Sequence, residues 1–449
     1  MNTPGTAVPL WRQLQATASV IEQVRAGTSA TPALAAVEPA LRAGVQALAF
    51  QTMRQLGRAE ALRRRLAPRT PPPPADALLC TALALCWRAE DAPYEAFTLV
   101  DQAVEAAKRH PATRGQTGFI NACLRRFLRE QPALVAATDS EPVAHWNHPR
   151  WWIERLRHDH PRHWQAILQA ANTQPPMTLR VNARKSTPAL LLQAWAAMQV
   201  EARPVGEHGL VLTRPRPVHE VPGFDQGQVS VQDAAAQLAA PLLLRELDGM
   251  RPLRLLDACA APGGKTAHLR ELAGDEAELI ALDVDPARCE RIRETLARLG
   301  LAAQVVAADA AEPSAWWDGQ PFDGILLDAP CTASGIVRRH PDVRWLRREA
   351  DVARLAALQA RLLDALWPLL RPGGRLLYCT CSVFRAEGEA QIQSFVAHNT
   401  DAALRPAPGH LIPQTGANPD PLRDNLPGDH DGFFYALLEK RRQPGGRLG

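Results

Sequence analysis

The stretch LLDACAAPGGKT, residues 255–266, constrains the fold of this chain more than any other. It predicts a buried strand over 253–256 that passes through small residues into a helix over 266–272. Small residues let the backbone approach a ligand closely, and the N–H groups at a helix N-terminus lack helical partners. We therefore expect a nucleotide-binding loop here.

A phosphate-binding P-loop is the first alternative for this stretch. Its pattern is G-x-x-x-x-G-K-[ST], and Gly264-Lys265-Thr266 supplies the second half. Cys259 stands where the first glycine should be, and Pro262 removes an N–H from the loop. An NTPase that uses Asp328 as its metal-binding acid remains a minority interpretation, because no second acid follows Asp328.

The spacing after the loop favours a Rossmann-type unit. Nineteen residues after Gly264, a second apolar strand ends in Asp283, where such a unit places an acid beside a ribose diol. Further strands are expected at 304–308, 324–327 and 375–379, separated by helices at 286–299 and 350–370. The alternation predicts an α/β fold with a parallel sheet.

Polar side chains follow these strands where each one ends, which is where such sheets bind ligands. The residues are Asp257, Asp283, Asp309, Asp328, Cys331 and Cys381. A single aspartate after a strand is as readily a helix cap or turn residue. Four aspartates in register with two cysteines predict a functional site.

Five runs of residues resemble a known family. They are DACAAPGGKT (257–266), ALDVD (281–285), LLDAPCTASG (326–335), IVRRHPDVRW (336–345) and YCTCSV (378–383). The chain resembles bacterial RNA cytosine-C5 methyltransferases that use S-adenosylmethionine. It is most similar to the 16S rRNA enzymes that carry a NusB-like amino-terminal domain, which act on a cytosine of the position-967 type.

The resemblance implies roles for individual residues. The cofactor-binding residues would be Cys259, Ala260, Ala261, Pro262, Gly263, Gly264, Lys265, Asp283, Asp309 and Asp328. Cys381 would be the nucleophile, with Cys331 as its helper. Relatives usually lack a cysteine at position 379, so Cys379 leaves open which thiol a labelling reagent would trap.

The side chains also suit this chemistry on general grounds. C5 of cytosine is a poor nucleophile, and a thiolate that adds to C6 makes C5 electron-rich. The C5 proton must later leave, so a base is needed as well. Asp328 is expected to hydrogen-bond the N3/N4 edge of the base. Methylation of an exocyclic amine would instead favour [DN]-P-P-[FYW], whereas here Cys331 follows Asp328-Ala329-Pro330.

Three domains are predicted. Residues 1–145 are expected to form an all-α, NusB-like RNA-binding domain with helices at 37–66, 75–88, 95–109 and 118–129. Residues 146–220 are expected to form a linker helix and an RRM-like (ferredoxin-like) β-α-β-β module. Residues 221–449 are expected to form the Rossmann-like catalytic domain that uses S-adenosylmethionine.

Charge gives weak support for an RNA partner. Residues 1–145 carry 16 basic and 12 acidic side chains, and residues 146–220 carry ten and five. Tryptophans that alternate with arginines in 146–164 would either stack on bases or anchor a helix to a neighbouring domain, and their histidines are expected at the surface. Arg125, Arg126 and Arg129 either meet phosphates or form a solvated face. The segment 338–345 is expected to contact RNA at the lip of the site.

The composition excludes several classes of protein. Eight cysteines without framework spacing do not predict disulfides, and Cys379-Thr380-Cys381 is not a zinc or redox pair. We expect a cytoplasmic monomer with no metal and no membrane segment. The expected partner is 16S rRNA, either naked or in an early small-subunit particle. Another RNA such as tRNA, or a non-catalytic assembly factor, are the alternatives.

Overall fold

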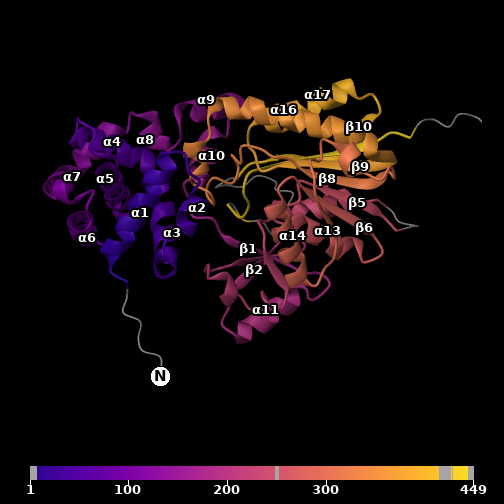
Figure 1. Cartoon of the computed structure of the whole chain (residues 1–449), viewed down its shortest axis with the longest axis horizontal. Coiled ribbons are helices and arrows are strands. Elements are labelled where there is room, and N and C mark those ends of the chain that lie inside the picture. Colours follow the sequence, from indigo (N-terminus) through magenta and orange to yellow (C-terminus); the bar gives the residue numbers. More distant parts are fainter. Residues whose placement is uncertain (1–7, 248–251, 414–425, 427, 443–449) are drawn as a thin grey trace, which may run out of the picture. The chain divides into compact units, whose positions relative to one another are not determined.

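The protein is described by a computed structural model that covers residues 8–247, 252–413, 426 and 428–442. The chain divides into two compact units. One comprises the chain up to Gln174 together with Val337–Glu349, and the other comprises Pro175–Ile336 together with the chain from Ala350 onward. Figure 1 shows helices throughout the first unit and the long sheet, in orange and yellow, in the second.

The first unit is built of helices, as predicted. They are α1 Leu10–Arg25, α2 Ala30–Ala35, α3 Pro39–Met53, α4 Leu56–Leu66, α5 Pro73–Cys86, α6 Ala96–Arg109, α7 Thr117–Thr138, α8 Pro142–Trp146, α9 Arg150–Asp159, α10 Trp164–Ala170 and α15 Val343–Leu346. Helix α5 is buried on every side from Ala75 onward, because the other helices surround it. The prolines before it do not break it, since Pro73 occupies the first helical position.

The predicted helix at 37–66 is two helices, α3 and α4, that are interrupted at Arg54 and Gln55. Both helices bury their apolar side chains in the same core, so the apolar spacing runs on across the break. Neither glycine nor proline marks the break at this position. The sequence therefore carried no local signal for it.

The first part of the second unit is a small four-stranded sheet. Strands β1 Met177–Val181, β2 Ala202–Val205, β3 Gly209–Leu212 and β4 Val229–Val231 are ordered β2-β3-β1-β4 with antiparallel pairs, and helix α11 spans Pro188–Ala197. The predicted β-α-β-β arrangement is confirmed. Strand β4 adds to its edge, so residues beyond 220 contribute to this sheet.

The large sheet has seven strands in the order β10-β11-β9-β8-β5-β6-β7. They are β5 Arg254–Ala258, β6 Glu278–Asp283, β7 Gln304–Ala307, β8 Phe322–Asp328, β9 Leu370–Thr380, β10 Ala402–Leu411 and β11 Phe433–Lys440. The helices of this unit besides α11 are α12 Ala239–Leu244, α13 Gly264–Ala273, α14 Pro286–Leu299, α16 Glu349–Leu366 and α17 Glu389–His398. Buried apolar side chains cover both faces of the sheet, which explains why its strands read as continuous apolar runs.

Strands β5 to β9 are parallel, as predicted, but the sheet as a whole is mixed. Strand β11 pairs antiparallel with β9, and β10 pairs antiparallel with β11. The expected parallel sheet is confirmed for these five strands and does not extend to this edge. Strand β10 was not predicted because it contains Pro406 and Pro408, and proline is tolerated in sheets only at edges and bulges. In the structure, β10 is an edge strand whose register shifts between Arg405 and Gly409.

Candidate active site

The glycine-rich loop joins β5 to α13 as the sequence predicted. Cys259 and Gly263 both adopt left-handed backbone conformations, with φ of 71° and 93°. A Cβ on Gly263 would lie 3.1 Å from the Cα atom of Ile292, so the loop passes close to helix α14. The N–H of Ala260 donates to the carbonyl of Leu282 at 2.7 Å and ties the loop to β6.

Three predicted carboxylates lie at the carboxyl ends of neighbouring strands. Asp283 ends β6, and its Oδ2 accepts the N–H of Ala261 at 3.2 Å. Asp309 follows β7 and forms an ion pair with Arg361 at 3.0 Å. Asp328 ends β8 and lies 2.6 Å from Nζ of Lys265. The sheet order therefore brings these groups to the edge where the glycine-rich loop lies.

Lys265 is engaged by protein rather than open to a phosphate. Burial alone would lower the pKa of its ammonium group, but the carboxylate of Asp328 raises that pKa above its usual value. Nζ also lies 5.5 Å from the ring centroid of Phe433. A P-loop lysine has to reach a nucleotide's phosphates, so this ion pair weighs against the NTPase interpretation.

Asp257 is fully buried at the end of β5. Its Oδ2 accepts a hydrogen bond of 2.6 Å from the hydroxyl of Thr266. Burial raises the pKa of Asp257 to about 7, although the Thr266 hydroxyl opposes the shift. Its contact fixes the first turn of α13 relative to β5.

The two predicted thiols meet in space. Cys331 lies in the loop after β8 and Cys381 directly follows β9, and their sulfur atoms are 3.5 Å apart. The hydrogen bond to Cys381, together with burial, raises the pKa of Cys331 well above its usual value. Cys331 therefore holds its proton tightly, and either sulfur of the pair can be the hydrogen-bond donor.

Cys379 lies inside β9 and is fully buried. Its sulfur is 3.5 Å from Oδ1 of Asp328, and burial raises the pKa of this thiol well above its usual value. Cys381, by contrast, is only half-buried. Reactivity requires exposure and a stabilised thiolate, and Cys381 meets the first condition better than Cys379.

A buried carboxylate that sequence reasoning missed connects the two thiol-bearing loops. Glu387 is fully buried, and it accepts hydrogen bonds from the N–H of Thr332 at 2.8 Å and from the hydroxyl of Ser382 at 2.6 Å. Thr332 follows Cys331 and Ser382 follows Cys381 in the chain. The sequence signal was slight, since Glu387 is one of two glutamates in the stretch RAEGEAQ (385–391), in which α17 begins.

Arg180, on β1, also supports the loop and was not predicted. Its guanidinium is buried, pairs with Glu271 of α13 at 2.7 Å and donates to the carbonyl of Gly264 at 2.7 Å. Burial lowers the pKa of Arg180, and Glu271 counteracts that shift. The small sheet thus contributes a hydrogen-bond donor to the backbone of the cofactor loop.

The segment 338–345 is less exposed than we expected. Arg338 and Arg344 are buried, and Arg344 donates to the carbonyl of Ala171 at 2.6 Å. Asp342 accepts the N–H of Ala30 at 2.9 Å. Arg338 and Arg344 are therefore not the exposed phosphate contacts that we expected, whereas Arg339 is half-buried and His340 is exposed. RNA contact by this segment stays a prediction.

The aromatic segment at 146–164 also differs in part from expectation. Trp152 is buried, as an anchoring role requires, whereas Trp146 and Trp164 are half-buried and their ring centroids are 4.9 Å apart. His148 and His160 are buried, so the expectation of surface histidines was wrong for these two. Burial and the nearby Arg344 hold the pKa of His148 well below its usual value.

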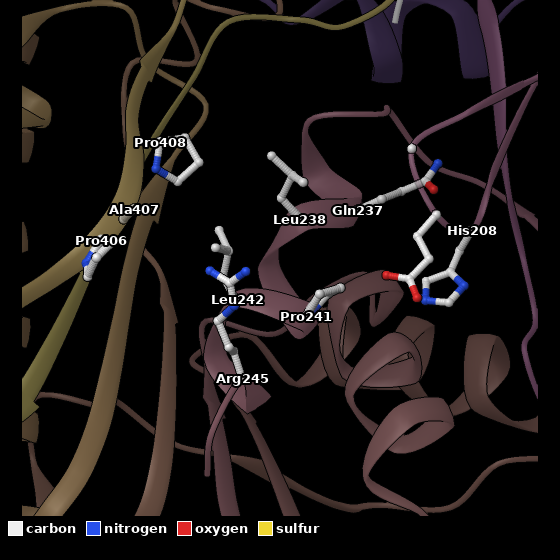
Figure 2. Close-up of a pocket in the computed structure, with 11 residues that line it drawn as sticks. His208, Gln237, Leu238, Pro241, Leu242, Arg245, Pro406, Ala407 and Pro408 are labelled. Atoms are coloured by element: carbon white, nitrogen blue, oxygen red, sulfur yellow. The ribbon is translucent and has the colours of Figure 1, made fainter. Parts of the chain in front are cut away.

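The second unit has a cavity of about 740 Å³ that none of the predicted site residues lines. Figure 2 shows Pro406 and Pro408 on one side of it, Leu238 between, and His208 on the other side. It lacks thiols and strand-end carboxylates. The chemistry therefore belongs to the thiol pair and the glycine-rich loop rather than to this larger space.

Two features are absent from the part of the chain that the structure describes. No group of three or more histidine, cysteine, aspartate or glutamate residues there has the arrangement of a metal site. Within the same residues, no helix has the length and apolar character needed to cross a membrane.

Comparisons with known proteins agree with this geometry. The family model described as "16S rRNA methyltransferase RsmB/F" matches residues 246–439. The model of the "Methyltr_RsmF/B-like, ferredoxin-like domain" matches residues 148–219, and that of the "NusB family" matches residues 7–129.

Individual relatives match most of the chain. Ribosomal RNA small subunit methyltransferase B of Vibrio cholerae is 44% identical over 77% of each chain. The protein of the same name from Salmonella arizonae is 46% identical over 72% of this chain and 73% of its own. Among solved structures, PH0851 is 25% identical and superposes with a TM-score of 0.71 over 95% of this chain and 99% of its own.

Proposed function

Because this chain belongs to the RsmB/F family of 16S rRNA methyltransferases, we propose that it methylates C5 of a cytosine through a covalent adduct with Cys381. The enzyme transfers methyl groups to rRNA and uses S-adenosylmethionine. That the methyl group goes to C5 of a cytosine, and that this cytosine is of the position-967 type, are the specific parts of the proposal. The observation that carries it is the 3.5 Å pair of Cys331 and Cys381 beside the glycine-rich loop.

The residues at the loop fit S-adenosylmethionine. A side chain at Gly263 would be crowded by Ile292, and Asp283 lies at the next strand end, where a ribose diol can be bound. We propose that the loop from Cys259 to Lys265, with Asp283, Asp309 and Asp328, holds the cofactor. When bound, S-adenosylmethionine supplies an electrophilic methyl group.

The proposed reaction begins with Cys381. Its thiolate forms a bond to C6 of the cytosine, and the electron pair of the C5–C6 double bond becomes available at C5. The S–H of Cys331 supports this step, since it donates toward the sulfur of Cys381 and stabilises negative charge there. Asp328, which pairs with Lys265, is the proposed acceptor of a hydrogen bond from the amino group of the base.

The adduct is resolved in a second stage. After C5 has gained the methyl group, a base removes the C5 proton and the electron pair of that C–H bond re-forms the C5–C6 double bond, which expels the thiolate of Cys381. Cys331 is the proposed base for this step, because its sulfur lies 3.5 Å from that of Cys381. Cys331 first releases its own proton to water, and its thiolate then takes the C5 proton, so that the one proton lost in the overall reaction goes to water. The raised pKa of Cys331 makes this thiolate a strong base.

The test is methyl transfer from labelled cofactor to unmodified 16S rRNA, with nucleoside analysis of the product. We expect 5-methylcytosine at one position, and a product methylated on nitrogen would refute the proposal. Cys381→Ser should abolish transfer, and Cys331→Ala should leave a protein–RNA adduct that survives denaturant. Cys289→Ala is the matched control, because Cys289 is buried in α14 and takes no part in the proposed reaction.

Transfer to tRNA is measured in the same assay. Preference for tRNA over 16S rRNA would contradict the proposed substrate but not the chemistry. Absence of transfer to any RNA by the wild-type protein, with the cofactor bound, would favour a non-catalytic assembly factor instead.

A further inference from the structure

The helical unit contains a cavity of about 590 Å³ that the proposed reaction does not use. Two tryptophans and two arginines line it: Trp87, Trp146, Arg58 and Arg88. Amide side chains supply much of the remaining lining, at Gln51, Gln55, Asn147, Gln169, Asn172 and Gln174. None of the residues that line it is an aspartate or a glutamate. Its size lies in the range of small-molecule sites.

The floor of this cavity is rigid because its amides are fully engaged. Asn147 accepts the N–H of Gly57 at 2.8 Å and donates to the carbonyl of Met53 and to Oδ1 of Asn172, both at 3.1 Å. Asn172 donates in turn to the carbonyl of Trp146 at 3.1 Å. These two amides therefore fix the shape of the cavity rather than form hydrogen bonds with a ligand.

The groups available to a ligand lie at the walls and rim. Trp87 is half-buried, with the guanidinium of Arg58 5.1 Å and that of Arg88 5.8 Å from its ring centroid. Its indole N–H donates to Oε1 of Gln55 at 3.1 Å, which leaves the NH₂ of Gln55 at the cavity wall. Gln169 and Gln174 are exposed at the rim.

We propose that this cavity binds one unpaired nucleotide of the substrate rRNA, outside the nucleotide that is methylated. Indole rings stack on bases, and amides can both donate to and accept from base edges. The guanidinium groups of Arg58 and Arg88 can favour a phosphate, although Arg58 pairs with Asp139 and Arg88 with Glu90, both outside the lining. The cavity holds neither thiols nor strand-end carboxylates, so the base bound there does not react. The proposal rests on rRNA as the substrate, which is part of the proposed function.

The test measures binding of the full-length protein to a single-stranded 16S rRNA fragment, without cofactor, over a range of salt concentrations. The variant is Arg88→Ala combined with Gln169→Ala, two exposed positions whose change leaves the core intact. We expect about tenfold weaker binding from lost base and phosphate contacts. The slope of the logarithm of the binding constant against the logarithm of the salt concentration should become shallower by about one, because one fewer phosphate is neutralised. Binding within about twofold of wild type overturns the proposal.

Matched controls lie on the same unit. Arg109 is also exposed, also lies over a tryptophan (4.7 Å from the Trp11 centroid) and also pairs with a glutamate, but it does not line the cavity. Gln165 is exposed one turn before Gln169 on α10 and is likewise outside the lining. Arg109→Ala with Gln165→Ala should bind as wild type, and an equal loss in this control would also overturn the proposal.

Cross-linking gives a second readout. RNA that carries 5-iodouridine should cross-link to a peptide that contains Trp87 or Trp146, and cross-links only elsewhere contradict the proposal. The two proposals fail separately. A wild-type protein that makes no 5-methylcytosine refutes the proposed reaction and leaves the binding result valid, whereas unchanged binding by the cavity variant refutes only the nucleotide site.

Discussion

Glu387 provides the sharpest test of how the two thiols are positioned. Its carboxylate is the common acceptor for Thr332 and Ser382, each of which is adjacent in the chain to one of the thiols. Burial raises the pKa of Glu387, while hydrogen bonds from Ser382 and Thr332 oppose that shift. Replacement with alanine would leave the N–H of Thr332 and the hydroxyl of Ser382 without their acceptor.

These contacts determine how much stability the replacement of Glu387 should cost. A hydrogen bond to a charged group contributes about 1.5–3 kcal/mol, and removal of one partner from a buried charged network costs about 3–5 kcal/mol. We expect Glu387→Ala to lower the free energy of unfolding by about that amount. Glu387→Gln keeps the shape and one acceptor, so its loss should be about 1–2 kcal/mol.

The rate of methyl transfer should fall more than the stability of the folded protein explains. A misplacement of reacting groups by about 1 Å lowers rates about 100-fold. We therefore expect Glu387→Ala to lower kcat by that order, at a temperature where the variant is folded, with the Kd for S-adenosylmethionine unchanged.

The assays are urea unfolding, calorimetric cofactor binding and single-turnover methyl transfer. The control is Glu389→Gln, two residues further along the chain, because Glu389 is exposed and pairs with Arg385 at the surface. A folded Glu387→Ala protein with kcat within about threefold of wild type would refute the reasoning, since a 1 Å displacement costs far more.

Three further predictions concern the loop and the helical unit. Asp257 has a pKa of about 7 when folded and about 4 when unfolded, so its contribution to stability is complete below pH 4 and is lost as pH rises through 7. This contribution falls by about 2–3 kcal/mol between pH 5 and pH 8, and Asp257→Asn should abolish that change in the free energy of unfolding, as measured by denaturation at the two pH values. Gly263→Ala forces an L side chain into a left-handed conformation 3.1 Å from Ile292, and should cost about 1–2 kcal/mol and weaken cofactor binding. Gly264→Ala, whose Cβ would lie 3.7 Å from its nearest protein neighbour, should leave the free energy of unfolding nearly unchanged and is the stability control for Gly263→Ala. Arg344→Ala leaves buried carbonyls, including that of Ala171, without their donor and should cost about 3–5 kcal/mol in thermal unfolding, against less than about 0.5 kcal/mol for the exposed Arg348→Ala.

Most strands of the seven-stranded sheet could be predicted from local sequence patterns. Apolar runs predicted the parallel strands, and helix α14 was predicted with its observed bounds, because Pro286 starts it and Gly300 ends it. Strand β10 was missed, since Pro406 and Pro408 obscure it and the pairing that makes it a strand comes from β11. The break between α3 and α4 was missed for a different reason, because the apolar spacing continues across it and no glycine or proline marks it.

The sequence by itself determined which chemical groups reach the ligand-binding edge, because the carboxyl ends of parallel strands share one edge of a sheet. It could not determine that Cys331 and Cys381, fifty residues apart, lie within 3.5 Å, or that Lys265 pairs with Asp328. Those contacts depend on β8 lying between β5 and β9. Tertiary structure alone decided that Arg344 is buried and that Glu387 joins two loops, because burial and hydrogen-bond partners come from segments remote in the chain.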